Sequence, residues 1–262
     1  MQDWGWISIE IIDQNINMRT LAGLFVFITC FQVSFSQSLV ETAVYDWNPS
    51  GTILNGSGAV LSSQQLSGHT IRGGKRRVFQ SASNGPELFF IIKYGPVDVM
   101  LNGATRRLDK GSVVFVLPGD EVAFRNPRKD DVEIYEMRMT ASDRDESRGK
   151  NAGPSFMMDW FDMTFRAHER GGVRQLFDRK TVTMQRFDIH ITQLNPGLSS
   201  HPPHTHQNEE IILMIDGEGE MILGSKPHRI VTGQTAWVAS MLPHNITNIG
   251  KRPALYFAIQ WN

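Results

Sequence analysis

The amino-acid sequence predicts an all-β protein in which one sandwich or barrel unit occurs twice. Short runs rich in β-branched and aromatic residues recur along the chain, such as 112–117 ("SVVFVL"), 186–194 ("RFDIHITQL") and 254–261 ("ALYFAIQW"). Turn signals such as "NG", "PG" and "GEG" occur between these runs, and many short strands at regular spacing are typical of sandwiches and barrels. Only 62–67 ("SSQQLS") and 171–177 ("GGVRQLF") indicate short helices.

An internal repeat supports the duplication. "VYDW" at 44–47 recurs as "MMDW" at 157–160, "ELFFIIKYGPVDVML" at 87–101 resembles "EIILMIDGEGEMIL" at 210–223, and 110–126 resembles 232–248. The matches keep the same order and nearly the same spacing, which is the signature of repeated structural units. We therefore predict a first domain over 37–140, a linker over 141–156 that contains the charged run "SDRDESRGK", and a second domain over 157–262.

The first 36 residues have the pattern of an export signal. "MRTLAGLFVFITCFQVSFSQ" begins at Met18 with a basic residue, continues as an apolar run and ends in small residues, which predicts a secretory signal peptide cleaved after Ser36. Residues 1–17 are then an upstream extension, and the protein is expected to be exported to the periplasm or the exterior. A lipoprotein signal that uses Cys30 is the alternative, but Phe27 stands three residues before it, where a lipobox would have a different residue.

Composition excludes several classes of function. The net charge is −1, so no basic surface for nucleic acid is expected. The apolar run over 21–35 is shorter than the roughly 20 residues of a membrane span, so none is predicted. Cys30 is the sole cysteine, and a chain that starts at Gln37 would have no thiol for a disulfide, a metal ligand or a nucleophile.

Histidines and a glutamate are concentrated in the second copy. In "HPPHTHQNEE", His204 and His206 are two residues apart, so on a strand both side chains would lie on one face, and a short turn separates them from Glu210. His244 begins "HNITN", a strand that could return alongside. Three imidazoles and one carboxylate with positions left open suit a first-row divalent ion, so we predict a metal site at these four residues.

The same residues carry a resemblance to the cupin superfamily, whose two motifs are G(X)5HXH(X)3,4E(X)6G and G(X)5PXG(X)2H(X)3N. The chain has His204-Thr-His206, three residues, Glu210, six residues and Gly217, and later His244, three residues and Asn248. Six residues instead of five separate Gly197 from His204, and Ala239 and Met241 stand where Pro and Gly are usual. The resemblance implies two tandem jelly-roll β-barrels and one metal held by His204, His206, Glu210 and His244.

Other polar residues of the second copy are open to two interpretations. Glu209 competes with Glu210 as the ligand, and the spacing to Gly217 favours Glu210, which leaves Glu209 facing outward or supporting the site. His201 is interpreted as a solvated loop residue rather than a substrate contact, and His190 as part of a polar outward face rather than of the barrel lining. No general base is evident; Glu209, His201, Tyr256 and Gln260 are the candidates.

The first copy lacks the ligand set. Matching the two copies by sequence places Ser81, Ser83, Glu87 and Val122 opposite His204, His206, Glu210 and His244. Serine and valine do not replace imidazole as ligands, so the first barrel is expected to be metal-free. If Glu87 is buried, it needs a partner such as Arg76, Arg77 or Lys93.

The expected function is that of a secreted metalloprotein, as an enzyme that acts on a small oxygen-rich substrate such as a sugar acid, keto acid or diol. A metal-dependent binding or sensing protein without turnover is the alternative. The cofactor would be one divalent transition metal (Mn, Fe, Ni, Co or Zn), and the partners a small molecule and, in an oligomer, further copies of the chain. Ureidoglycine aminohydrolase is a similar two-cupin enzyme, but its ligand pattern has Glu and Gln where this chain has His, so that activity is not expected.

Overall fold

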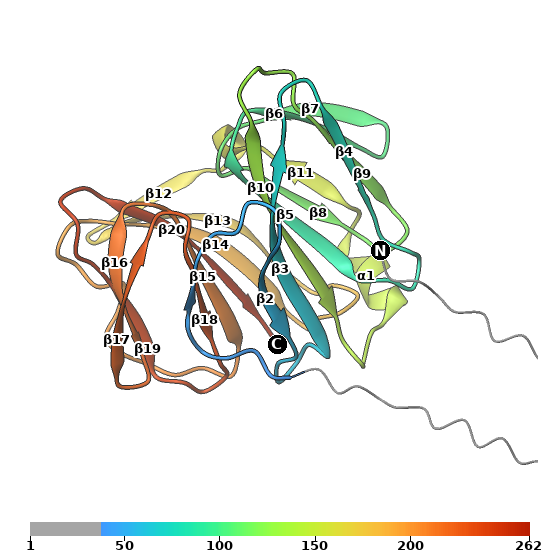
Figure 1. The fold of residues 1–262 in the computed structure, drawn as a ribbon. Helices are drawn as coiled ribbons and strands as arrows, with labels where there is room; N and C mark the ends of the chain where they lie inside the picture. The colour runs from blue at the N-terminus through green and yellow to red at the C-terminus, as the bar shows by residue number, and fades with distance from the viewer. Residues whose placement is uncertain (1–37) are drawn as a thin grey trace, which may run out of the picture. The chain divides into compact units, whose positions relative to one another are not determined.

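The computed structural model describes residues 38–262 and confirms the all-β prediction with two jelly-roll barrels (Figure 1). Each barrel consists of one large and one small antiparallel sheet. No helix within the described range is long and apolar enough to cross a membrane. The signal peptide and the upstream extension lie outside the described residues, and their assignment stays a prediction.

The first barrel combines a six-stranded and a four-stranded sheet. The larger sheet has the order β11-β8-β5-β10-β3-β2 and the smaller one β4-β9-β6-β7. The strands that the first half of the chain supplies are β2 (Thr52–Gly56), β3 (Ser63–Ile71), β4 (Arg76–Gln80), β5 (Glu87–Tyr94), β6 (Val97–Leu101), β7 (Ala104–Leu108), β8 (Val113–Val116), β9 (Glu121–Arg125) and β10 (Val132–Thr140).

The second barrel repeats this plan with a seven-stranded and a three-stranded sheet. Their orders are β1-β18-β15-β20-β14-β13-β12 and β17-β16-β19. The strands from the second half of the chain are β12 (Phe165–His168), β13 (Gly171–Arg179), β14 (Phe187–Leu194), β15 (Glu209–Asp216), β16 (Glu218–Leu223), β17 (Lys226–Val231), β18 (Thr235–Val238), β19 (His244–Asn248) and β20 (Ala254–Trp261).

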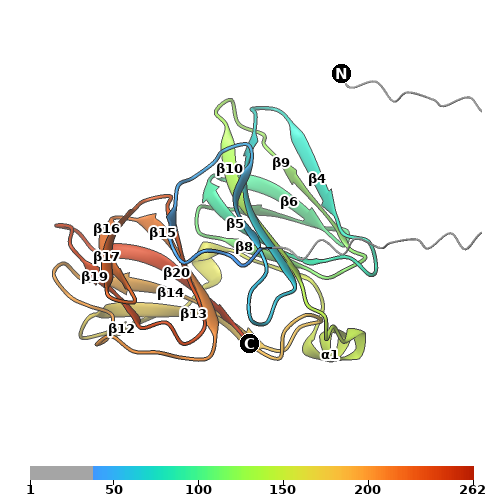
Figure 2. The same cartoon turned by 60° about the horizontal axis from the view of Figure 1, so that its bottom comes forward.

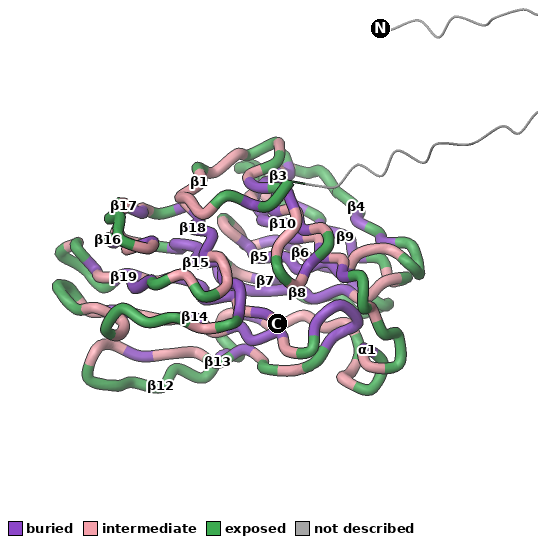
Figure 3. The backbone as a smooth tube through the Cα atoms, turned by 90° about the horizontal axis from the view of Figure 1, so that it is seen from below, coloured by how far each residue is buried: buried purple, intermediate pink, exposed green. Residues whose placement is uncertain are grey.

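Each large sheet also receives a strand from the other half of the chain. β1 (Val44–Tyr45) pairs with β18 of the second barrel (Figure 3), and β11 (Phe156–Met158) pairs with β8 of the first (Figure 1). β1 and β11 contain the start of the repeated "VYDW" and "MMDW" segments, so the repeat marks the exchanged strands. The predicted domain boundaries, which put each segment with its own half, do not take this exchange into account.

The two large sheets face each other across the largest hydrophobic core (Figure 2). This core takes side chains from both barrels, for example Phe89 and Phe115 from the first and Phe187 and Trp237 from the second. A second core fills the inside of the first barrel, and a third lies inside the second barrel. The large sheets are therefore covered on both faces, and their apolar residues are divided between the contact with the other barrel and their own barrel interior.

Each barrel has one buried glutamate that binds a loop of the other barrel. Glu87, at the start of β5, accepts hydrogen bonds from the backbone N–H groups of Val182 and Thr183 at 2.7 and 3.2 Å, and from the Thr181 hydroxyl at 2.7 Å. Glu209, at the start of β15, accepts from the N–H groups of Ala59 and Val60 at 2.6 and 3.3 Å and from the Trp261 indole at 3.2 Å. Arg76, Arg77 or Lys93 was the expected partner of Glu87. A loop of the second barrel supplies its hydrogen-bond donors instead.

The structure corrects the two helix predictions. The stretches 62–67 and 171–177 belong to β3 and β13, because each pairs with strands on both sides. The short helix α1 (Glu146–Ala152) lies instead in the predicted linker, which also precedes the 3-10 turn Trp160–Asp162. Asp145 caps α1 by accepting hydrogen bonds from the N–H groups of Ser147 and Arg148.

Candidate metal centre

The three histidines predicted as ligands converge inside the second barrel. One ring nitrogen from each of His204, His206 and His244 lies within 4.8 Å of the others. His204 and His244 are held together by their backbones, with reciprocal N–H to carbonyl hydrogen bonds of 3.2 and 3.0 Å. Glu210, the second residue of β15, extends its carboxylate to the same place: its Oε2 lies 3.4 Å from His206 Nε2 and 3.1 Å from His244 Nε2.

The orientation of the rings fits a bound cation. His206 Nδ1 lies 2.9 Å from the Asn208 carbonyl oxygen and His244 Nδ1 lies 2.8 Å from that of Leu242. A carbonyl only accepts, so each Nδ1 carries the proton and each neutral ring presents an Nε2 lone pair to the centre, as metal-bound histidines do. Both Nε2 atoms are buried and have no well-directed hydrogen-bond partner among the described residues. A divalent ion between them and Glu210 would use all of these atoms.

Glu210 is held as an anion. Burial alone would raise the pKa of its carboxyl group, but the adjacent imidazoles of His206 and His244 and a hydrogen bond from Gln260 lower the pKa below its ordinary value. Gln260 Nε2 donates to Glu210 Oε1 at 3.0 Å. The imidazoles respond in opposite directions: Glu210 raises the pKa of His206, whereas burial and the neighbouring histidines lower the pKa of His204.

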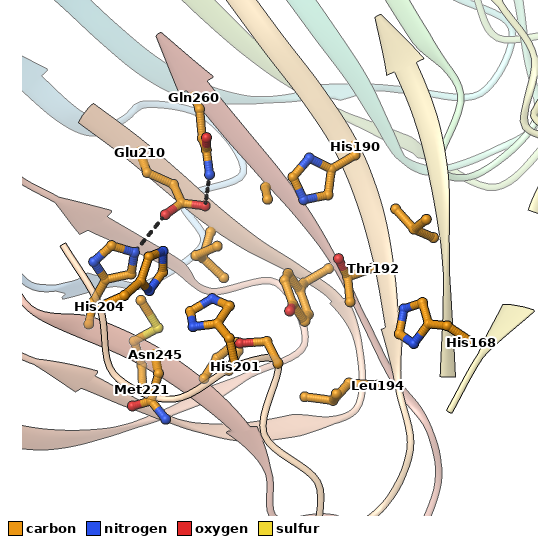
Figure 4. A pocket seen from close by; sticks show the side chains of 17 residues that line it. His168, His190, Thr192, Leu194, His201, His204, Glu210, Met221, Asn245 and Gln260 are labelled. Atoms are coloured by element: carbon orange, nitrogen blue, oxygen red, sulfur yellow. Dashed lines mark hydrogen bonds and ion pairs between the residues drawn. The ribbon is translucent and has the colours of Figure 1, made fainter. Parts of the chain in front are cut away.

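A cavity of about 340 Å³ opens on this cluster (Figure 4). Its walls come mainly from the barrel-facing side of β14, β15 and β20 and from the segment before β15. The residues that line it are His168, Val173, His190, Thr192, Leu194, Ser200, His201, His204, Glu210, Ile212, Met221, His244, Asn245, Ile246, Tyr256, Ala258 and Gln260.

Comparison with known proteins agrees with the sequence motifs. Residues 190–260 match the family model described as the cupin domain. The second half of the chain thus contains a cupin domain. A rice (Oryza sativa subsp. japonica) protein described as a probable (S)-ureidoglycine aminohydrolase is 30% identical over 70 residues, which are 27% of this chain and 23% of that protein. The match thus spans about a quarter of the curated relative.

Solved structures share the fold over most of the chain. AerE from Microcystis aeruginosa has a TM-score of 0.60 at 14% identity and covers 86% of this chain and 98% of its own. A mutant of Bacillus subtilis oxalate decarboxylase has a TM-score of 0.60 at 12% identity and covers 85% of this chain and 75% of its own. At these identities the similarity shows the fold and leaves the reaction open.

Two histidines of the second cupin lie in the cavity, contrary to the sequence interpretation. His190 points into the barrel, because its neighbours Ile189 and Ile191 are directed to the core between the barrels. His201 lies in a loop, as interpreted, and is half-buried; it also lines the cavity, where its ring packs edge-on against that of His204 with 3.9 Å between the ring centres. His168, on β12, was missed entirely, and no motif in the sequence marks it.

The segment with the first two ligands is not a regular strand. His204 forms only an isolated bridge, and His206 lies outside β15. Pro202 and Pro203 have no N–H to donate to a ladder, which accounts for the interruption. Met241, in the place of the glycine of the second motif, adopts a positive φ of 62° and donates its N–H to the His206 carbonyl at 2.8 Å, so it keeps the glycine-like turn next to the ligands.

The candidates for catalysis separate into two groups. Glu209 does not face outward or reach the cavity, because its carboxylate is directed to Ala59, Val60 and Trp261. Tyr256 and Gln260 line the cavity together with His201. Burial raises the pKa of the Tyr256 phenol, so it stays neutral near neutral pH and keeps its proton available for donation.

The structure also corrects the alignment of the two cupins. In the first barrel Phe79 pairs with Val122 as His204 pairs with His244, and the Ser81 carbonyl accepts from Gly119 as that of His206 does from Met241. Leu88 pairs with Val116 as Glu210 pairs with Val238. The positions equivalent to the four predicted ligands are therefore Phe79, Ser81, Leu88 and Val122, and Glu87 corresponds to Glu209. The sequence match placed Ser81, Ser83 and Glu87 wrongly because the loop between β4 and β5 is longer in the first cupin.

Proposed function

We propose that the protein is a metal-dependent enzyme that acts on a small oxygen-rich substrate in its second cupin. His204, His206, Glu210 and His244 would hold one divalent transition metal. The observation that carries this proposal is the convergence of three imidazoles and one buried carboxylate beside a cavity that His204, His244 and Glu210 line, with one ring nitrogen each of His206 and His244 left without a hydrogen-bond partner. Three nitrogens and one oxygen suit Mn, Fe, Co, Ni and Zn alike, so the ligands do not select the metal.

Such an ion would act as a Lewis acid toward a substrate oxygen. A substrate with two adjacent oxygens, such as a keto acid, a sugar acid or a diol, can chelate it through positions that the four protein ligands leave open. The chain's own residues would then orient the substrate. His201 covers His204, Gln260 holds Glu210, and His190 and Thr192 present hydrogen-bonding groups further along the cavity.

Cavity-lining imidazoles favour an enzyme over a binding protein without turnover. Purely apolar walls would offer a bound molecule no group that transfers a proton, whereas His168, His190 and His201 line this cavity in addition to the predicted ligands. The enzyme names of the relatives point the same way, since they include an aminohydrolase and a decarboxylase. The alternative remains a metal-dependent binding or sensing protein.

The test combines metal analysis with turnover. Protein purified from its native compartment should contain about one transition-metal ion per chain, and His206→Ala should contain almost none while keeping its β-rich fold. The native protein is then incubated with a panel of keto acids, sugar acids and diols, and their consumption is followed by NMR with and without dioxygen. Consumption by the native protein but not by His206→Ala supports an enzyme. Binding without consumption would support the sensing protein, and a metal-free native protein would contradict the proposal.

Export is a second proposal, based on the residues before Gln37 alone. Mass spectrometry of the protein from the periplasm or the medium should give a chain that begins at Gln37. A chain that begins before Met18 would contradict it.

A further inference from the structure

The cavity has a far end, away from the predicted ligands, with its own polar character. In Figure 4, Glu210 and His204 stand on one side, His168 stands on the opposite side, and His190 and Thr192 lie along the wall between them. Thr192 pairs with Tyr256 across β14 and β20, and His190 pairs with Ala258, so these side chains belong to the barrel-facing side of the large sheet. A substrate held at the metal ligands would extend its other end toward these groups.

The far end carries no permanent positive charge. None of the 17 residues that line the cavity is a lysine or an arginine. Arg170, the nearest in sequence to His168, donates instead to the carbonyls of Ser199 and Ser200 at 3.2 and 3.0 Å. A divalent ion with the Glu210 carboxylate would leave one net positive charge at the metal end, which a single substrate carboxylate neutralises.

A carboxylate already lies behind the far wall. Asp188 Oδ1 is 3.9 Å from His190 Nδ1. Asp188 is mostly buried and also accepts from Gln175 at 2.9 Å and from Arg186 at 2.9 Å. Even a protonated His190 would therefore have its charge compensated from within the protein. A second carboxylate on the substrate would find no free cation at this end and would approach the Asp188 carboxylate, which has the same charge.

We propose that the far end selects substrates with an uncharged hydroxylated tail: the substrate would be a monocarboxylate of the 2-oxo or 2-hydroxy acid class whose tail hydrogen-bonds with His190 and Thr192. This inference rests on the proposed function, because it assumes that the acid group lies at the metal. It goes further than the proposed function in two ways. It excludes dicarboxylates as substrates, and it assigns the selection of the substrate's tail to β14, whose residues are not among the predicted metal ligands.

Three probes of equal chain length test this selection. They are 2-oxopentanoate, 5-hydroxy-2-oxopentanoate and 2-oxoglutarate, which end in a methyl group, a hydroxyl group and a carboxylate. Their affinities are measured by calorimetry at pH 8 on metal-loaded and on metal-stripped protein. On the loaded protein the hydroxylated probe should bind about three- to tenfold more tightly than the methyl probe, as one net hydrogen bond allows, and 2-oxoglutarate should bind at least about tenfold more weakly than the methyl probe.

The outcomes separate the two proposals. Loss of all binding on metal removal supports the proposed function. The same order of affinities with and without metal would contradict the proposed function and leave the far-end selection intact. Equal affinities, tightest binding of 2-oxoglutarate, or no binding of any probe to the loaded protein would overturn the inference itself.

A variant of His190 tests whether the wall formed by β14 causes the preference for the hydroxylated probe. His190→Ser introduces the residue that the first barrel has at the equivalent position, Ser67, and it should remove most of the preference for the hydroxyl over the methyl probe. Affinity for the methyl probe and metal content should stay within about twofold, which also shows that the variant is folded. His228→Ala, on β17 and outside the cavity lining, is the matched control and should keep the full preference. An unchanged preference in His190→Ser would count against the assignment to this wall.

Discussion

The two barrels share one plan of sheets but differ in what fills their interiors. Around the four ligand-equivalent positions the first barrel packs Phe79, Phe90 and Phe124 ring against ring, with 4.9 to 5.7 Å between ring centres. The second barrel has His204, Ile212 and Ile246 at these places. Replacing three phenylalanines by smaller side chains leaves the space that the cavity occupies.

A second difference lies on the neighbouring strands. In the first barrel the buried His69 and Glu136 lie 2.7 Å apart, and Arg138 reaches the other oxygen of Glu136 at 2.7 Å. The register places Thr192, Ala258 and Gln260 at these positions of the second barrel. Polar side chains that pair with one another thus fill the region where the second barrel is open. The same jelly roll can therefore hold either a packed interior or a cavity with a site.

The largest effect is expected when a predicted metal ligand of the second barrel is replaced by the equivalent residue of the first barrel. His244→Val introduces the equivalent of Val122 and removes a ligand. Affinity for the metal should fall by at least about 100-fold, because loss of a mere supporting group around a metal already costs about 10- to 100-fold. Metal titration followed by elemental analysis measures this.

The fold of His244→Val should survive, because Val122 is fully buried in the same place in the first barrel. Circular dichroism gives the control. Full metal occupancy in this variant would remove His244 from the site.

Removing the carboxylate of Glu87 or Glu209, each of which binds a loop of the other barrel, should lower the stability of the protein and leave metal binding unchanged. Glu87→Ala leaves the buried N–H groups of Val182 and Thr183 without their acceptor, so the free energy of unfolding should fall by about 3 kcal/mol. Urea denaturation measures the change. Glu209→Ala, at the equivalent position, should also destabilise the protein.

Glu210→Ala is the matched contrast to Glu209→Ala. It should abolish metal binding, whereas Glu209→Ala should keep it, since the Glu209 carboxylate is directed to the other barrel. If Glu209→Ala lost the metal and Glu210→Ala kept it, the assignment of the two adjacent glutamates would be reversed.

The sequence predicted the repeat, most strands and the convergence of the histidines with Glu210, because these depend on local spacing. Prediction from the sequence failed where the position of a side chain depends on which part of the molecule covers each face of a sheet. His190 alternates with Ile189 and Ile191, and the apolar face was assigned to the barrel interior. In the structure that face packs against the other barrel, so the polar face lines the cavity. Alternation alone cannot indicate this when both faces of a sheet are covered.

Proton competition should weaken metal binding in the second barrel. Only neutral imidazole binds a metal. Since Glu210 raises the pKa of His206, protons compete there as the pH falls toward the ordinary value of about 6.5. The lowered pKa of His204 delays its protonation, and the lowered pKa of Glu210 keeps that ligand ionised. Affinity should therefore fall by about tenfold from pH 7 to pH 6, and further by pH 5.

A competition titration with a chelator of known affinity at each pH measures this. The melting temperature of the metal-free protein over the same range separates unfolding from loss of metal. Constant affinity between pH 7 and pH 5 would argue against a site with three histidines.

The smallest expected effect concerns Ser81, which occupies the position of His206 in the first barrel. Its hydroxyl donates to the Pro86 carbonyl at 2.6 Å and so holds the longer loop before β5. Ser81→Ala should lower the free energy of unfolding by about 1 kcal/mol, the usual contribution of one hydrogen bond, and leave metal content unchanged. Ser83→Ala should change neither quantity measurably if the corrected alignment holds. A loss of metal in Ser81→Ala would instead mean that the first barrel supports a site, and the contrast between a packed and an open interior would no longer account for where the metal binds.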